Sequence, residues 1–390
     1  MGTQTRTYRV AQFFRAAIAG EKAVAVWRLP NTPETQACVQ LTHGFTTGQP
    51  QLERSPFGFL FCPFQTAAQH QNIFIKADVQ LVDGELKTAA DVPPPTAADF
   101  HTLLNAENPN TWHRGGITQE AHYQTEQGFT SAVAKAVKAI QAEEMEKVVL
   151  SRNKLEALPQ NFCPVTAFEA MAQAYPRAFV SLVSVPGVGT WMGASPEVLV
   201  SVNAEQVFHT IALAGTQPAV EKVGEAIWRQ KEIEEQAMVE RYILSCFKKL
   251  RLREYTEVGP RTIIAGNLMH LRTDFKVDLK EVHFPTLGTD MLQLLHPTSA
   301  VCGLPKEPAH QFILAHEGYD RSYYSGYLGP VGSETGSHLF VNLRCMELLD
   351  QEAILYAGAG ITGESDPQKE WQETQHKMQT MRQVLETLSN

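Results

Sequence analysis

The chain has 390 residues, of which 43% are hydrophobic and 19% charged, and its net charge is −9 at pH 7. This composition is typical of a globular protein of two or three domains, and a negative charge without any basic run argues against a nucleic-acid binder. No run approaches the ~20 apolar residues that span a bilayer, the first residues lack a signal-peptide core, and the six cysteines show no C-x-x-C spacing, which favours reduced thiols in the cytoplasm.

Strand-like and helix-like runs follow one another without strict alternation. Residues 1–92 alternate apolar runs at 22–30 and 71–82 with turns, and 93–125 is predicted to be a linker that begins in the proline-rich stretch 91–96. Further on, we predict helices at 127–144 and 219–250, a last helix that runs nearly to residue 390, and strands at 147–152, 178–184, 189–191, 197–203, 206–213, 260–266, 326–331, 338–346 and 352–358. This order favours an α+β fold with large antiparallel β-sheets.

Near the carboxyl end, the run "ILYAGAGITGESDPQKEW" places Gly358, Gly360 and Gly363 in a G-x-G-x-x-G pattern after an apolar strand. A dinucleotide-binding loop needs the helix to open at the glycines and a second strand to follow that helix. Here polar residues and Pro367 start the helix instead, and no strand comes after it. The pattern therefore predicts a strand whose bare glycine backbone approaches a ligand closely.

Two helices carry acids on their apolar faces. Glu232 and Glu235 fall within the apolar stripe of the helix that contains "KEIEEQAMVERYILSC", and Glu370 and Glu373 lie within or beside the stripe of the last helix. Carboxylates that face a core lose their hydration, so such acids should meet a cation, be protonated or line a wet cleft. The alternative is that both helices expose their first turns, where the helix dipole also favours acids.

A spacing of three residues puts both carboxylates of each pair on one side of its helix. If the two helices face each other, the four carboxylates form an oxygen-rich cavity suited to Mg²⁺, which normally takes one or two carboxylates and an anionic ligand. Glu373 and His376 also form E-x-x-H, a di-iron motif, but that site needs four long helices and a second E-x-x-H. Met238 stands where that second histidine would follow Glu235.

Seven ordered segments resemble those of the chorismate-utilising enzymes, a family that includes isochorismate, salicylate, anthranilate and aminodeoxychorismate synthases. The segments are "EKVVLSR" (146–152), "GASPEVLV" (193–200), "IALAGT" (211–216), "LLHPTSAVCGLP" (294–305), "YDRSYYSGYLG" (319–329), "LFVNLRC" (339–345) and "YAGAGITGESDPQKEWQETQHKMQTM" (356–381). The resemblance implies two big β-sheets packed together with helices outside. It further implies a variable amino-terminal part (1–126) and a chorismate-binding catalytic region (127–390) that form one intertwined structural domain.

Family members differ in the nucleophile that they add at C2 of chorismate. Ammonia users that resemble anthranilate synthase lack a lysine at the position of Lys147, and aminodeoxychorismate synthases resemble a pattern with lysine at the position of Ala214. The resemblance therefore implies the water-adding class, isochorismate synthase, in a quinone or siderophore pathway. The metal helix of the family usually reads close to K-D-x-x-E-H, whereas residues 231–236 read "KEIEEQ", with Gln236 in the place of the histidine.

The resemblance also implies roles for the site residues. Lys147 would act as general base on water and Glu197 as general acid on the leaving C4 hydroxyl, which requires a lowered pKa for the amine and a raised pKa for the acid. Mg²⁺ would be held mainly by Glu235 and Glu373. Further or water-mediated metal ligands would be Glu232 and Glu370. The substrate would be bound by Gly215, Thr216, His296, Tyr324, Arg344, Gly358 and Lys377, where Arg344 offers a planar fork to a carboxylate.

Alternatives remain open at this stage. They are a salicylate synthase, in which pyruvate loss follows the same first step, an ammonia-dependent synthase, and a non-catalytic chorismate- or metal-binding module. Taken one by one, Lys147 would usually be solvated, Glu197 a surface acid, Arg344 paired with a nearby acid, and His296 structural. We expect chorismate as the small-molecule partner and a cytoplasmic monomer or weak homo-oligomer.

Overall fold

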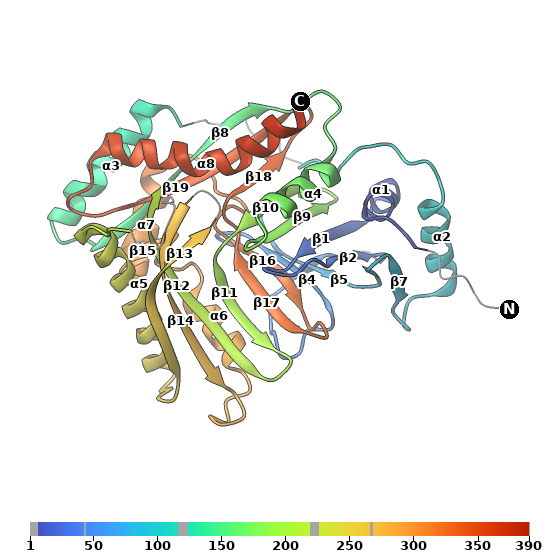
Figure 1. The fold of residues 1–390 in the computed structure, drawn as a ribbon, viewed down its shortest axis with the longest axis horizontal. Helices are drawn as coiled ribbons and strands as arrows, with labels where there is room; N and C mark the ends of the chain where they lie inside the picture. The colour runs from blue at the N-terminus through green and yellow to red at the C-terminus, as the bar shows by residue number, and fades with distance from the viewer. Residues whose placement is uncertain (1–6, 43, 116–123, 219–225, 266–267, 390) are drawn as a thin grey trace.

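Two large antiparallel β-sheets form the centre of the protein (Figure 1). The computed structural model describes residues 7–42, 44–115, 124–218, 226–265 and 268–389. The first sheet has ten strands in the order β15 (Gly303–Leu304), β8 (Lys147–Ala157), β19 (Glu352–Ile361), β18 (Cys345–Leu348), β10 (Gly189–Ser195), β9 (Phe179–Val185), β1 (Ala23–Arg28), β2 (Thr35–Gln40), β6 (Val79–Val82) and β7 (Glu85–Thr88). The second has nine strands in the order β13 (Thr256–Ala265), β14 (Leu268–Asp278), β12 (Val207–Pro218), β11 (Val198–Asn203), β17 (Gly336–Val341), β16 (Tyr327–Val331), β4 (Gly58–Cys62), β5 (Asn72–Lys76) and β3 (Thr46–Thr47).

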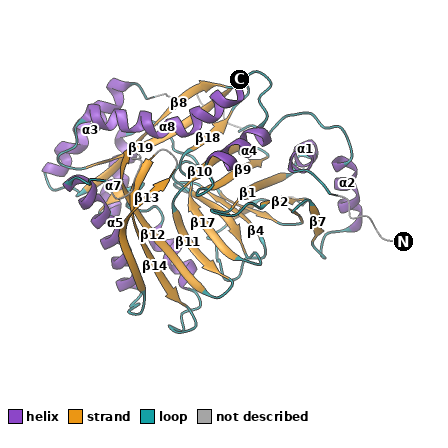
Figure 2. Cartoon of the chain, in the orientation of Figure 1, coloured by secondary structure: helices purple, strands orange, loops and turns teal. Residues whose placement is uncertain are grey.

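Helices cover the outer faces of the two sheets (Figure 2). The first sheet packs against α1 (Val10–Ala19), α2 (Pro94–Leu104), α4 (Pro164–Ala174) and α8 (Pro367–Ser389). The second sheet packs against α5 (Gln230–Lys249) and α6 (Leu287–Leu295). A smaller core around β8 joins α3 (Glu126–Gln141), α7 (Lys306–His316) and the start of α8.

An aromatic core lies between the two sheets. Along β1, Ala23, Ala25 and Trp27 face this inner core, while Val24 and Val26 face the helices. Successive strand residues point to opposite faces, so a strand covered on both faces reads as a continuous apolar run rather than an alternating one. Across the inner core, Phe179 of the first sheet stacks on Phe340 of the second with ring centroids 4.1 Å apart.

The amino-terminal strands form one end of each sheet. In the first sheet, β1 pairs antiparallel with β9, and in the second sheet β4 pairs antiparallel with β16. Strands that are about 150 to 270 residues apart in the chain therefore share backbone hydrogen bonds, and each sheet is made from both ends of the chain.

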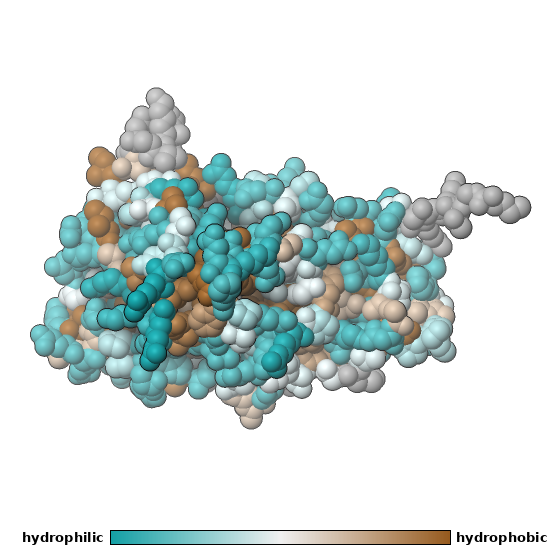
Figure 3. All heavy atoms as spheres, turned by 90° about the horizontal axis from the view of Figure 1, so that it is seen from below, coloured by the Kyte–Doolittle hydropathy of each residue, from teal (hydrophilic) through white to brown (hydrophobic). Residues whose placement is uncertain are grey.

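The described residues contain no helix that is both long enough and apolar enough to cross a membrane. The face of the molecule shown in Figure 3 is mostly hydrophilic, and hydrophobic residues appear on it as separate patches.

The predicted fold class, α+β with large antiparallel sheets and helices outside, is confirmed. Most predicted elements match as well. The helix predicted at 127–144 is α3, and the strands predicted at 147–152, 178–184, 189–191, 197–203, 206–213, 326–331 and 352–358 correspond to β8, β9, β10, β11, β12, β16 and β19. The strand predicted at 260–266 is β13, although residue 266 lies outside the described residues.

Three predicted elements differ from the structure. The single strand predicted at 338–346 is two strands in different sheets, β17 and β18, because the chain turns between them at Arg344, whose φ is 48°. The helix predicted at 219–250 begins only at Gln230; residues 226–229 are not helical and 219–225 lie outside the described residues. The predicted linker 93–125 contains α2, and its residues 116–123 are outside the described part of the chain.

Candidate active site

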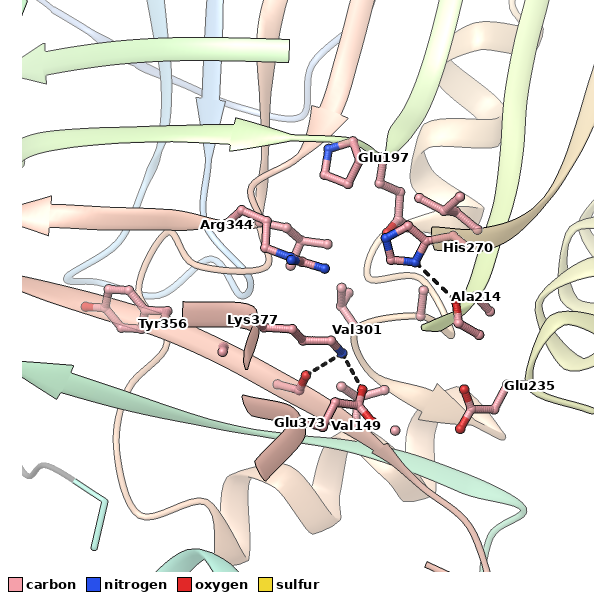
Figure 4. Close-up of a pocket in the computed structure, with 18 of the residues that line it drawn as sticks. Val149, Glu197, Ala214, Glu235, His270, Val301, Arg344, Tyr356, Glu373 and Lys377 are labelled. Carbon is pink, nitrogen blue, oxygen red and sulfur yellow. Dashed lines mark hydrogen bonds and ion pairs between the residues drawn. The ribbon is translucent and has the colours of Figure 1, made fainter. Parts of the chain in front are cut away.

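One pocket collects most of the predicted site residues where the two sheets approach each other (Figure 4). Its walls come from β8, β12, β14, β19, α5, α8 and the connections between strands. Of the predicted residues, it is lined by Lys147, Glu197, Gly215, Glu235, Tyr324, Arg344, Gly358, Glu373 and Lys377. Residues that are far apart in the chain thus converge on one cavity.

Lys147 is the first residue of β8 and only 3% exposed. Its position is fixed by the strand, because Val148 pairs with Ile361 of β19 and Lys147 itself pairs with Leu304 of β15. Burial lowers the pKa of the Lys147 amine, against the opposing effect of the Glu235 charge, which favours the protonated form. The amine is therefore displaced toward the neutral form that a general base needs.

Glu197 lies between β10 and β11 and is 6% exposed. Its backbone is held by two hydrogen bonds: its N–H donates to Ser195 Oγ (3.3 Å), and its C=O accepts from the N–H of Val341 (3.0 Å). Burial raises the pKa of the Glu197 carboxyl to about 7, although the positive charge of Lys147 opposes this shift. Near neutral pH a substantial fraction of this carboxyl carries a proton that it can donate.

Two cations extend into the pocket between Glu197 and Glu373 (Figure 4). Lys377 Nζ donates to Gly358 O (2.8 Å) and pairs with Glu373 Oε1 (2.7 Å). Burial lowers the pKa of Arg344, and a guanidinium still stays charged at neutral pH. The acids near Arg344 in the sequence are engaged elsewhere, since Asp350 pairs with Arg114 and Glu347 accepts a hydrogen bond from Tyr356.

Of the four predicted metal ligands, two line the pocket. Glu235 of α5 and Glu373 of α8 reach it from separate helices. Glu370, which is 2% exposed, instead accepts a hydrogen bond from Lys231 Nζ (2.6 Å). Glu232 does not line the pocket either, because its carboxylate accepts from the backbone N–H of Arg229 (2.8 Å) at the start of α5. Within the described residues, no group of three or more His, Cys, Asp or Glu side chains stands close enough to hold a metal.

The pair Glu235 and Glu373 nevertheless fits a hard divalent cation. Burial is the main cause that raises the pKa of Glu235, and the Glu373 charge raises it further, so the two carboxylates repel each other. Burial would also raise the pKa of Glu373, but its ion pair with Lys377 outweighs this and lowers it. Two oxygen donors beside a cavity for an anionic ligand match the way in which Mg²⁺ is usually held in proteins.

The remaining predicted substrate residues divide into two groups. Tyr324 and Gly358 line the pocket, and the Tyr324 ring stacks on Tyr356 with centroids 5.2 Å apart. His296 lies outside the pocket lining: its Nε2 donates to the carbonyls of Pro63 and Phe64 (both 3.2 Å). Burial lowers the pKa of His296 to about 4, so its ring is neutral. Thr216 belongs to β12, next to the pocket residue Gly215, and its side chain is outside the described part of the structure.

Sequence reasoning missed His270, which lines the pocket from β14. Its Nδ1 donates to the carbonyl of Gly215 (3.1 Å), and burial lowers its pKa to about 3, so the ring is neutral with Nε2 as its acceptor nitrogen. The strand β14, "LMHLRTDFKVD", was not predicted, because charged residues interrupt its apolar pattern. Recognising it as the partner of "IALAGT" would have placed His270 opposite Thr216.

Known proteins resemble this chain in sequence and in fold. The profile of a family described as "Chorismate binding enzyme" matches residues 47–386. The chain is 31% identical over 246 residues to the vibriobactin-specific isochorismate synthase of Vibrio cholerae, and this match covers 61% of either chain. It is also 31% identical over 269 residues to anthranilate synthase component 1 of Streptomyces coelicolor, and that match covers 66% of this chain and 51% of the relative. The match thus spans about three fifths or less of the length of these relatives.

The fold is similar to that of a solved structure, the menaquinone-specific isochorismate synthase MenF of Escherichia coli. The TM-score is 0.76 at 23% sequence identity, and the match covers 97% of this chain and 91% of the other. The family match covers most of the chain, and the pocket residues that it includes converge on one cavity. The chain belongs to the family of chorismate binding enzymes.

Proposed function

We propose that the protein is an isochorismate synthase, which adds water at C2 of chorismate and releases the C4 hydroxyl. The observation that carries this proposal is the presence of Lys147 and Glu197 in one pocket with pKa values shifted in opposite directions. An amine with a lowered pKa suits a general base, and a carboxyl with a raised pKa suits a general acid near pH 7.

The charges of the pocket suit a dianionic substrate. Chorismate carries two carboxylates, and Arg344 and Lys377 bring two cations into the cavity. Arg344 can meet a carboxylate with two parallel N–H groups. A Cβ at Gly358 would lie 3.1 Å from the Tyr324 hydroxyl, so a side chain there would crowd another residue that lines the pocket.

Proton transfers at both ends of the ring complete the reaction. Lys147 in its neutral form removes a proton from a water that attacks C2, while the ring double bonds shift. Glu197 donates its proton to the C4 oxygen, which leaves as water. One water enters and one leaves, so the reaction is an isomerisation, and the two side chains regain their starting protonation through solvent.

Glu235 and Glu373 would hold Mg²⁺ in this proposal. When bound, Mg²⁺ supplies positive charge that neutralises the ring carboxylate and the two acids. Glu370 and Glu232 would act at most through water, because Lys231 and the Arg229 backbone already engage them.

Sequence identity does not decide between water and ammonia as the nucleophile, because an isochorismate synthase and an anthranilate synthase component both reach 31%. The decision rests on Lys147, a buried base that water requires and that a neutral ammonia molecule does not. Ala214 adds to it, because its methyl side chain brings no amine to the part of the pocket wall that β12 forms.

Product analysis tests the proposal. The purified protein is incubated with chorismate and Mg²⁺ in the absence of ammonia, and the products are separated by HPLC. We expect isochorismate, and no product from Lys147→Ala. Salicylate with pyruvate would identify a salicylate synthase, and product only with ammonium would identify an ammonia-dependent synthase. Binding of chorismate without turnover would leave a non-catalytic module.

We also propose a cytoplasmic monomer or weak homo-oligomer in which residues 1–126 and 127–390 form one intertwined domain. All six cysteines are free thiols, as a reducing compartment would keep them. The pairing of β1 with β9 and of β4 with β16 ties the two parts together. Light scattering after size exclusion measures the oligomeric state, and a single thermal transition is expected for one domain.

A further inference from the structure

One backbone edge of strand β12 is only partly covered by another strand among the described residues. On one side, β12 pairs with β14 over its whole length. On the other side, β11 pairs with it only at His209 and Phe208. Among the strands that the structure describes, none pairs with this edge further along, at Ala212 and Ala214. Buried backbone groups need partners, so something else must meet these groups.

The side chain of Gln236, on α5, meets them. Its Oε1 accepts from the N–H of Ala214 (3.0 Å), and its Nε2 donates to the carbonyl of Ala212 (3.3 Å). In a β-strand, alternate residues direct their N–H and C=O groups toward the same edge. The carboxamide therefore binds this edge as one peptide unit of a neighbouring strand would.

The carboxamide is itself held in one orientation. Gln236 is 1% exposed, and its Nε2 lies 3.0 Å from Glu240 Oε1 and 3.1 Å from Thr273 Oγ1. Thr273 also donates to Glu240, so α5 and β14 form one network around the amide. A carboxamide offers both a donor and an acceptor, which this position requires.

Both partners of this contact carry residues of the pocket. Glu235, the neighbour of Gln236, lines it from α5, and Ala214 and Gly215 line it from β12. The two elements approach closely here, because a Cβ on Gly215 would lie 3.1 Å from Glu232 Cβ. Gly215 has a φ of +61° in a β-bulge, where the regular ladder is interrupted. The wall is thus least supported by its own sheet where Gln236 binds it.

We propose that Gln236 is a positioning residue of the active site. Its carboxamide takes the place of a neighbouring strand. It thereby fixes the position of Ala214 and Gly215, which line the pocket on β12, relative to Glu235, which lines it on α5 and would hold Mg²⁺. The expected effect on chorismate turnover rests on the proposed function. Gln236 is also a departure of this chain from the family pattern, in which histidine is usual at this position.

Three variants test the inference. Gln236→Met removes both hydrogen bonds with little change in volume, and we expect kcat/KM for chorismate to fall by about 10- to 100-fold, as is typical for groups that orient metal ligands. The loss should appear as a higher KM and a higher Mg²⁺ concentration for half-maximal activity. Both should be seen at an assay temperature well below the melting temperature of the variant. Gln236→His restores one donor and one acceptor and should recover activity to within about fivefold of wild type. The control is Gln230→Met on the exposed first turn of α5.

Hydrogen exchange gives a readout that does not depend on turnover. The Ala214 amide should exchange at least about tenfold faster in Gln236→Met than in the wild type, because its acceptor is gone, and at the wild-type rate in Gln230→Met. If Gln236→Met does not fold, Gln236→Ser replaces it in both measurements, since its short side chain stays polar but no longer reaches the N–H of Ala214.

The outcomes separate the two proposals. A wild type without turnover of chorismate refutes the proposed function, and the exchange rate of Ala214 then decides on Gln236 alone. An active wild type with unchanged kcat/KM in Gln236→Met overturns the positioning role, even if the variant melts earlier. A loss of activity that histidine does not recover, with unchanged exchange at Ala214, overturns it as well.

Discussion

Replacing Gly360 by alanine should move the Lys147 amine without straining the backbone. Gly360 lies in β19 opposite Val149, and its φ is outside the left-handed region that only glycine favours. A Cβ at this position would lie 3.1 Å from Lys147 Cε, 3.6 Å from Nζ and 3.8 Å from Glu235 Oε1. Carbon atoms normally approach to about 3.5–4.0 Å, so Lys147 must shift by about half an ångström.

The size of the effect follows from this shift. A misplacement of about 1 Å can lower a rate about 100-fold, so half of it should lower kcat by about tenfold, or about 1.4 kcal/mol of activation free energy. The assay is the initial rate of isochorismate formation by HPLC at saturating chorismate and Mg²⁺, with the melting temperature measured in parallel.

A glycine of the same motif provides the control. In Gly363→Ala, the new Cβ would lie 3.6 Å from Ile140 Cγ2 and 3.8 Å from Gln141 Cγ, which are ordinary contacts, so the rate should not change. The reasoning about Lys147 is refuted if Gly360→Ala turns over at the wild-type rate, or if both variants lose the same activity together with the same stability.

Three further predictions concern the acids and a buried ion pair. Glu197→Gln should lower kcat by about 10²- to 10⁴-fold. Burial raises the pKa of Glu197 from 4.5 to about 7, so the folded state holds this proton more tightly than the unfolded state. The resulting stabilisation of the fold is complete below about pH 4.5 and is lost as the pH rises through 7. Melting temperatures at pH 5 and 8.5 should therefore differ less in Glu197→Gln than in wild type, and an equal difference would contradict the raised pKa. Chelation of divalent ions should abolish turnover, and added Mg²⁺ should restore it. Glu235→Gln and Glu373→Gln should each raise the Mg²⁺ concentration for half-maximal activity more than about tenfold. An unchanged Mg²⁺ titration in both variants would exclude these two residues as ligands. Arg321→Met leaves Glu317 buried without the cation that it meets at 2.6 Å, which should cost about 3–5 kcal/mol of folding free energy. Denaturant unfolding measures the loss. The double variant with Glu317→Gln should recover only part of it, because the carbonyls of Val301 and Val149 still lack the Arg321 donor.

Local sequence pattern predicted the elements with strong periodicity, and ordered motifs predicted part of the pocket lining. Lys147, Glu197 and Arg344 stand in short segments whose order along the chain resembles one family, and the structure brings all three into one cavity. The pattern around Arg344 is apolar on both sides, so it reads as one strand. The change of sheet at this residue depends on which sheet each half joins, which is a tertiary property.

The orientation of the acids could not be predicted from spacing. Glu370 and Glu373 share one side of α8, but the rotation of α8 over the first sheet decides that Glu373 faces the pocket while Glu370 faces Lys231. His296 is similar, because the carbonyls that bind its ring belong to residues more than 230 positions earlier. Contacts over such separations leave no local trace in the sequence.

The order of strands in the first sheet has a consequence for folding during synthesis. β8, which carries Lys147, has β15 and β19 as its neighbours, and it reaches β10 only through β19 and β18. Since β18 and β19 come after residue 344, a growing chain presents β8 and β10 with open edges until almost the whole chain has emerged. Open strand edges promote association between chains, and late long-range pairing slows folding. Nascent chains that stall before β18 should therefore depend on chaperones, and Lys147 should reach its final surroundings last.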